Sequence, residues 1–117
     1  KITDAYYSEK ETMIGSVCHG ALGLVNAKDL DGNLLIAGRR MTGVTDKQLD
    51  ALGILFTPKH PEPELKNAGA IFEYGSAFRD VFATHVSVDD EQRFVSGQNQ
   101  NSGLEAAHKI TEILAGR

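Results

Sequence analysis

One stretch decides the fold: Met13-Ile14-Gly15-Ser16-Val17-Cys18-His19-Gly20-Ala21-Leu22-Gly23. Met13, Ile14 and Val17 favour a β-strand that leads into Cys18, which is the one cysteine of the chain. The small residues on both sides of the cysteine permit a sharp turn and a close approach between the strand and a following helix. This pattern is typical of a nucleophile elbow, in which a strained turn between strand and helix exposes the nucleophilic side chain.

The residues around Cys18 also favour a reactive thiol. The N-terminus of a helix stabilises negative charge, so a helix that begins after Cys18 predicts a lowered thiol pKa. His19 places a base directly beside the thiol. The alternative is a buried, inert cysteine at the end of a core strand, which is common for free cysteines. The cysteine, the histidine and the flanking glycines together favour the reactive thiol over that alternative.

The composition is that of one folded domain. The chain has 117 residues, of which 41% are hydrophobic, and this is enough for a real core. One cysteine cannot form an intrachain disulfide, so a reducing, cytoplasmic location is expected. No apolar run approaches the roughly 20 residues that span a bilayer, so no membrane association is predicted. The net charge of −4 is spread without a basic stripe, so nucleic-acid binding has no support.

Short apolar runs and turn signals predict several strands. They are expected at residues 12–17, 34–36, 40–42, 70–74, 85–88 and 93–96. Asp31-Gly32 and the acidic residues 89–91 are typical of turns, and the latter predict a hairpin or two neighbouring strands.

Capping signals predict the helices between these strands. Residues 1–9 are typical of the end of a helix, and residues 19–27 of a helix after the elbow. Thr45 with Gln48 forms a capping box that predicts a helix from Asp46 to about Gly53. Two prolines open a helix over residues 64–68. A second capping box starts the final amphipathic helix: its two members are Ser102 and Glu105, and its expected inward residues are Leu104, Ala107, Ile110 and Leu114.

At this level of detail the chain resembles the C-terminal part of the ThiJ/PfpI superfamily, which has the class I glutamine-amidotransferase-like fold. The branch it resembles most holds glutathione-independent glyoxalases (glyoxalase III) and related stress chaperones. Cys-His-Gly alone is a weak signal, but an ordered series of motifs over residues 12–116 is specific. The series is residues 16–20, residues 35–38 with 41–43, residues 64–70 and residues 94–102.

The resemblance implies an α/β fold of the flavodoxin-like type, a three-layer sandwich with a mostly parallel sheet and helices on both faces. Residues 1–117 would form the C-terminal portion of a single domain of this type. The active site would lie at the carboxyl edge of the strands, as in other open α/β sheets. A homodimer of the complete domain is also implied.

The resemblance also assigns site residues. Cys18 is the nucleophile, and His19 is the histidine that works beside it. An acidic third member is expected near the start of the helix after the Thr-Gly stretch, at Asp46 or Asp50, which share a helix face. We favour Asp46, and its alternative role is a first-turn carboxylate that stabilises the helix dipole.

No cofactor and no metal are expected. The four histidines (His19, His60, His85 and His108) lack ligand spacing, and His85 and His108 are expected to be structural or surface residues.

Members of the superfamily carry strands and helices before the elbow that have no counterpart in this sequence. Those elements hold a glutamate that hydrogen-bonds the nucleophilic thiol and a glycine-rich turn that supplies part of the oxyanion hole. The backbone N–H of His19 is the other oxyanion donor. We therefore expect an N-terminal half of the same domain, as a separate chain or a cleaved segment, to be a partner of this chain.

The implied function is glutathione-independent conversion of methylglyoxal-type 2-oxoaldehydes to 2-hydroxy acids through the Cys18 thiol. Two alternatives stay open. A cysteine hydrolase or amidase would use the same thiol on an acyl group. A stress chaperone or oxidation sensor would use exposed apolar surface or oxidation of the thiol instead.

Overall fold

The fold is mixed α/β, and a computed structural model describes residues 1–54, 57–76 and 83–117 of it. Its main sheet has three strands in the order β1-β5-β4: β1 (Ile14–Val17), β5 (Phe94–Gly97) and β4 (Val86–Val88). β1 is parallel to β5, with Ile14 beside Phe94, and β4 is antiparallel to β5. A second, two-stranded parallel sheet pairs β2 (Arg40–Met41) with β3 (Ile71–Phe72). The predicted hairpin over residues 85–96 is confirmed.

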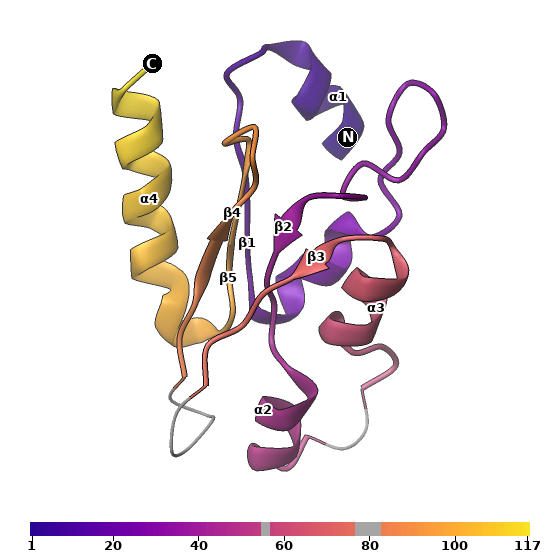
Figure 1. Ribbon diagram of the computed structural model, residues 1–117, viewed down its shortest axis with the longest axis vertical. Coiled ribbons are helices and arrows are strands. Elements are labelled where there is room, and N and C mark those ends of the chain that lie inside the picture. Colours follow the sequence, from indigo (N-terminus) through magenta and orange to yellow (C-terminus); the bar gives the residue numbers. More distant parts are fainter. Residues whose placement is uncertain (55–56, 77–82) are drawn as a thin grey trace.

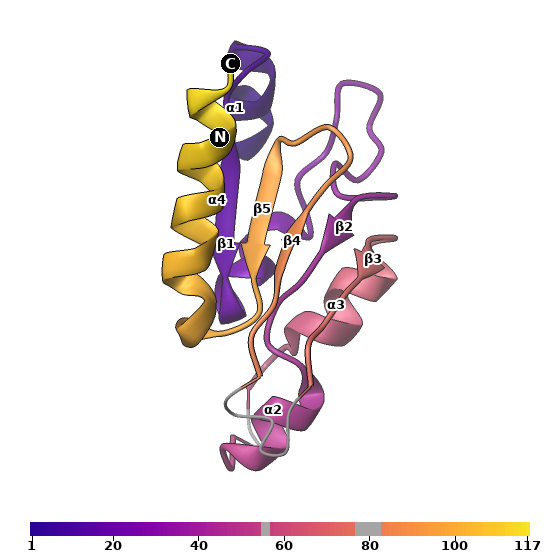
Figure 2. The same cartoon turned by 60° about the vertical axis from the view of Figure 1, so that its left-hand side comes forward.

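Helices lie on both sides of the main sheet (Figure 1; Figure 2). α4 (Gly103–Ala115) packs on β1 and β5, and the 3-10 helix η3 (Gln100–Ser102) leads into it. On the other side lie α3 (Pro61–Asn67) and the 3-10 helix η1 (Cys18–Leu24), which pack against each other. α2 (Asp46–Ala51) lies beyond the carboxyl ends of the parallel strands β1 and β5, and α1 (Ile2–Ser8) lies near the amino ends of these two strands.

The apolar core lies on the η1 and α3 side of the sheet. It is built from the fully or nearly fully buried residues Ala21, Leu24, Val25, Leu35, Ile36, Met41, Leu65, Ala68 and Phe94. On the α4 side, Gly15 allows a large side chain of the helix to approach the strand closely. A Cβ at Gly15 of β1 would lie 3.0 Å from Cδ1 of Ile110 in α4.

At the amino ends of the strands, charged side chains hold the elements together. The buried Asp89 carboxylate accepts hydrogen bonds from Arg39 Nη1 at 2.6 Å and from the backbone N–H groups of Arg93 and Phe94 at 2.8 and 2.9 Å. The guanidinium of Arg93 donates to backbone carbonyls of Tyr6 and Thr12, which fixes α1 and the start of β1. The guanidinium of Arg39 also stacks over the Phe94 ring at 4.6 Å.

Several helix boundaries differ from the sequence expectation. The segment after Cys18 is a 3-10 helix that ends at Leu24, because its three small residues favour a tight turn over a longer α-helix. α3 begins at Pro61, three residues earlier than expected, since a proline at the first helical position needs no hydrogen-bond acceptor. The capping box of α2 is confirmed, with Thr45 and Gln48 exchanging hydrogen bonds.

The expected strand at residues 34–36 is a buried turn. The backbone N–H of Leu35 donates to Ala27 at 2.8 Å, and those of Ala37 and Arg39 donate to Leu34 and Ile36. The apolar side chains of the segment do enter the core. A short apolar run indicates burial, but it does not distinguish a strand from a turn. The expected strand at residues 70–74 is likewise shorter, since only Ile71 and Phe72 pair with β2.

The second capping box is absent. Ser102 makes no cap hydrogen bond, and its hydroxyl donates instead to Asn99 Oδ1 at 3.2 Å. The inward face of α4 also differs from the expectation. Ala106 is buried and Ile110 is half-buried, whereas Ala107 and the other two predicted inward residues, Leu104 and Leu114, are exposed. The helix therefore turns Ala106 and Ile110 toward the sheet, and hydrophobic periodicity alone does not select the alanine.

Candidate functional site

Cys18 lies at the turn between β1 and η1, with a backbone φ of 58°. This is the left-handed region, where a residue with a Cβ is strained by about 1–2 kcal/mol. Strain of this kind persists only where the surrounding structure fixes the backbone, and it is typical of functional turns. The predicted strained elbow at the end of the strand is therefore confirmed.

His19 contacts the thiol directly. Its Nδ1 lies 3.6 Å from Cys18 Sγ, and its backbone N–H is hydrogen-bonded to the same sulfur. Burial raises the pKa of the half-buried thiol, and the hydrogen bond from the His19 backbone lowers it by less, so the net direction is upward. The sequence-based expectation of a lowered pKa is wrong for the described residues. The imidazole Nδ1 is thus within hydrogen-bond distance of the thiol.

The chain segment that follows β2 crosses directly over this elbow at Gly43. A Cβ at Gly43 would lie 3.2 Å from the carbonyl oxygen of Cys18, 3.2 Å from Cβ of Pro61 and 3.3 Å from Cβ of Ala21. Only glycine allows this approach. The crossing brings the start of α2 and the start of α3 to the same end of the sheet as the thiol.

Asp46, the favoured acidic residue, lies at the first position of α2. Its carboxylate binds His60 rather than His19: the distance from Asp46 Oδ1 to His60 Nδ1 is 2.9 Å. Its backbone N–H donates to Oε1 of Glu62 at 3.1 Å, and Lys66 binds the other oxygen of that carboxylate at 2.8 Å. These contacts join the beginnings of α2 and α3.

His60 and Glu62 were not among the residues expected from the sequence. The signal that could have found them is Pro61 itself, because proline is favoured at the first helical position and so marks residues 60–62 as a helix start. The other candidate acid, Asp50, lies one turn further along α2 and is exposed. His108 is exposed on α4, as expected.

Polar atoms without partners concentrate around the elbow. Within residues 1–54, 57–76 and 83–117, four buried side-chain atoms have no hydrogen-bond partner: Ser16 Oγ, His19 Nε2, Thr42 Oγ1 and His85 Nε2. The first three belong to residues within two positions of Cys18 or adjacent to Gly43. Buried polar groups are nearly always satisfied, so such a group calls for a specific explanation, and a ligand or a further contact is one. The fourth, His85 Nε2, lies 3.6 Å from Glu73 Oε1.

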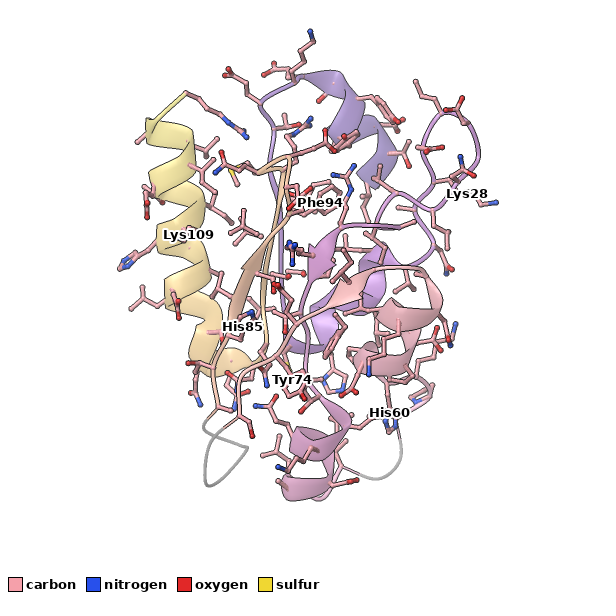
Figure 3. The ribbon with its side chains drawn as sticks, viewed as in Figure 1. Lys28, His60, Tyr74, His85, Phe94 and Lys109 are labelled. Atoms are coloured by element: carbon pink, nitrogen blue, oxygen red, sulfur yellow. The ribbon has the colours of Figure 1, made fainter. Side chains whose placement is uncertain are left out.

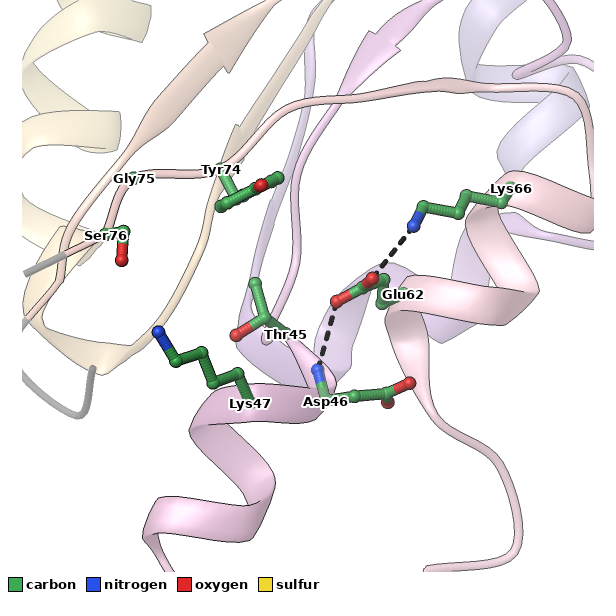
Figure 4. Close-up of a pocket in the computed structure, with 8 residues that line it drawn as sticks. All are labelled: Thr45, Asp46, Lys47, Glu62, Lys66, Tyr74, Gly75 and Ser76. Carbon is green, nitrogen blue, oxygen red and sulfur yellow. Dashed lines mark hydrogen bonds and ion pairs between the residues drawn. The ribbon is translucent and has the colours of Figure 1, made fainter.

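A cavity of about 440 Å³ opens at the same end of the molecule (Figure 4). It is lined by Thr45, Asp46, Lys47, Glu62, Lys66, Tyr74, Gly75 and Ser76. Figure 3 shows Tyr74 and His60 near this end, below β3 and α3. Cys18 and His19 are not among the described residues that line this cavity, so the cavity does not contain the elbow.

Other kinds of site find no support in the part of the chain that the structure describes. No group of three or more His, Cys, Asp or Glu side chains in it is arranged to hold a metal ion. No helix among the described residues has the length and apolar character to cross a membrane.

The chain is similar to proteins of known structure. No family model and no curated protein matches it. It superposes on Rapid Encystment Protein 24 KDa (REP24) of Francisella tularensis with a TM-score of 0.79 and 29% sequence identity, over 90% of this chain and 44% of that chain. The crystallographic structure of APC35852 gives a TM-score of 0.81 and 31% identity, over 97% of this chain and 49% of that chain. The chain thus spans about half the length of each protein.

Proposed function

We propose that this chain contributes the nucleophilic cysteine of a ThiJ/PfpI-type domain that converts methylglyoxal-type 2-oxoaldehydes to 2-hydroxy acids without glutathione. The observation that carries the proposal is the strained elbow, where Cys18 has a φ of 58° and His19 Nδ1 lies 3.6 Å from its sulfur. An adjacent base activates a thiol nucleophile, and in this pair the imidazole is within reach of the sulfur.

The reaction begins when the Cys18 sulfur attacks the aldehyde carbon. A carbon–sulfur bond forms, the thiol proton moves to His19 Nδ1, and the aldehyde oxygen becomes an oxyanion. Protonation of that oxygen gives a hemithioacetal. Because the pKa of the Cys18 thiol is raised, we propose that the thiol loses its proton to His19 during the attack and is not ionised beforehand.

A base then removes the proton from the former aldehyde carbon, and a proton is returned to the neighbouring ketone carbon through an enediol. The first carbon is oxidised and the second is reduced, so no external redox partner is needed. The product is a 2-hydroxyacyl thioester on Cys18. Water cleaves this thioester, releasing the 2-hydroxy acid and restoring the thiol.

We further propose that the complete fold is a flavodoxin-like three-layer sandwich in which another segment lies beside β1. In the described residues β1 is an edge of the main sheet, and β5 is its one strand partner. A groove of about 290 Å³ lies between β1 and α4, and it is lined by small residues of both, among them Gly15, Ala106 and Ala107. The two similar solved structures are about twice as long as this chain. That segment would also bring the glutamate and the second oxyanion donor expected for such a site.

The test is formation of lactate from methylglyoxal by the whole natural polypeptide in the absence of glutathione. Cys18→Ala should abolish turnover. Absence of lactate from a folded, unmodified protein would contradict the proposal. Release of acid or ammonia from esters or amides instead would favour the cysteine hydrolase.

Two carboxylate variants test the acidic member of the site. Asp46→Asn should lower turnover by about 10²-fold or more, as when a catalytic histidine loses its carboxylate partner. Asp50→Asn, one turn away on the same helix, is the matched control and should have little effect. The reverse ranking would assign the role to Asp50.

A further inference from the structure

The two histidines nearest the elbow differ in their partners. His60 Nδ1 lies 2.9 Å from the Asp46 carboxylate, whereas the buried Nε2 of His19 has no hydrogen-bond partner among the described residues. Figure 4 shows the Asp46 side chain extending away from Tyr74, Gly75 and Ser76. In this structure the carboxylate is therefore paired with His60.

The backbone brings both histidines close to the same crossing point. His19 adjoins Cys18, His60 adjoins Pro61, and a Cβ at Gly43 would lie 3.2 Å from atoms of both Cys18 and Pro61. Asp46 follows Gly43 by three residues. Both histidines are thus attached to backbone that packs on the segment carrying the carboxylate.

The proposed reaction requires a hydrogen-bond acceptor for His19 Nε2, and none is present among the described residues. When His19 Nδ1 takes the thiol proton, the ring becomes a cation whose Nε2–H must donate to an acceptor. A buried cation with an unpaired donor is costly, and a carboxylate is the strongest acceptor that a protein offers.

We propose that His60 is a positioning residue that competes with His19 for Asp46, and that the carboxylate passes from His60 Nδ1 to His19 Nε2 when the thiol proton moves. This inference rests on the proposed function. The side chains of His60 and Asp46 are 32% and 50% exposed, and exposed ion pairs are weak. The carboxylate is therefore held loosely enough to exchange.

His60 can be replaced without disturbing its helix. It is the N-cap residue of α3, but its side chain makes no cap hydrogen bond. His60→Ala should free the carboxylate and raise turnover about two- to fivefold, because the competing pair is a weak, exposed one. His60→Asn, whose amide N–H can replace the Nδ1 donor, should return turnover toward the unmodified value. His108→Ala, on the exposed face of α4, is the control.

The decisive measurement does not depend on activity. Nitrogen-15 NMR of the histidine rings in the whole polypeptide reports which ring nitrogen carries a hydrogen-bonded proton. His60→Ala should shift the Nε2 signal of His19, and the same substitution in an Asp46→Asn background should not. A His19 signal that is identical in the unmodified protein and in His60→Ala would overturn the inference.

Activity and NMR together separate the two proposals. If the His19 signal shifts as expected but no variant forms lactate, the carboxylate exchange stands and the proposed reaction fails. If His60→Ala lowers turnover as much as Asp46→Asn does, His60 belongs to the catalytic group itself and the competition is refuted.

Discussion

The two ends of the main sheet are built on opposite principles. At the amino ends of the strands, the Asp89 carboxylate accepts three hydrogen bonds, and the guanidinium groups of Arg39 and Arg93 bind carboxylates and backbone carbonyls. At the carboxyl ends of β1 and β5, Cys18 has a strained backbone, and among the described residues the buried His19 Nε2 and Thr42 Oγ1 have no hydrogen-bond partner. The polar groups named at the first end are all paired within the fold, whereas these two at the second end are not.

The largest change in the free energy of unfolding is expected at the amino ends of β1 and β5, where Asp89 lies. Asp89→Ala removes a buried carboxylate and leaves two backbone N–H groups without their acceptor, and Arg39 keeps Glu91 as its remaining carboxylate partner. Breaking such a buried arrangement should lower the free energy of unfolding by about 3–5 kcal/mol. Urea denaturation measures it. Asp90→Ala is the control, because it removes an exposed partner of Arg40 and should leave the urea midpoint unchanged. Equal effects of the two substitutions would remove the contrast between the ends.

A smaller loss is expected where the backbone crosses the elbow. Gly43→Ala places a methyl group 3.2–3.3 Å from a carbonyl oxygen and two other carbons, none of which is the tip of a flexible side chain. Overpacking of this kind costs about 1–3 kcal/mol. The variant should also change the alkylation rate of Cys18 by iodoacetamide, because the elbow must shift. Gly20→Ala is the matched control within η1, since a Cβ there would meet nothing within 4 Å. Full stability and an unchanged alkylation rate in Gly43→Ala would show that the crossing does not constrain the elbow.

The smallest effect is expected at an unsatisfied hydroxyl. Thr42→Val removes the unpartnered Oγ1 and keeps the shape of the side chain, and the backbone hydrogen bond from Thr42 to Ser96 is retained. The free energy of unfolding should stay within about 1 kcal/mol or rise, because an unsatisfied buried hydroxyl is itself a cost. Ser87→Ala is the contrasting variant. The Ser87 hydroxyl donates to Glu73 at 2.7 Å, so its removal should lower the free energy of unfolding. A clear destabilisation by Thr42→Val in the same urea denaturation would mean that the Thr42 hydroxyl does have a hydrogen-bond partner in the folded protein.

Sequence patterns predicted the features that are encoded locally. The strand before Cys18, the capping box of Thr45 and Gln48, the β4–β5 hairpin and the final helix all depend on residues within a few positions of one another. The elbow belongs with them, because one strand, one turn and several small residues determine it. For these features the sequence predicted the correct kind of element, and the observed first and last residues differ from the expected ones by a few positions.

Features that depend on distant partners were not predictable. The burial of residues 34–36 in a turn depends on the acceptor at Ala27, and the orientation of α4 depends on how closely Gly15 lets Ile110 approach. The pairing of Asp46 with His60 joins residues 14 positions apart on two separate helices. The raised pKa of Cys18 has the same origin, since burial of the thiol comes from the folded chain and not from its neighbours in sequence.

The register of the main sheet has a consequence for the order of folding. Ile14 pairs with Phe94, about 80 positions later, whereas Val88 and Val95 of the hairpin are only seven apart. Closing a long loop costs more chain entropy than closing a short one, and distant pairings slow folding. We expect the hairpin to form early and β1 to dock late. During synthesis, Cys18 therefore leaves the ribosome well before the strand that will fix its backbone exists, and its left-handed turn is among the last parts of the molecule to form.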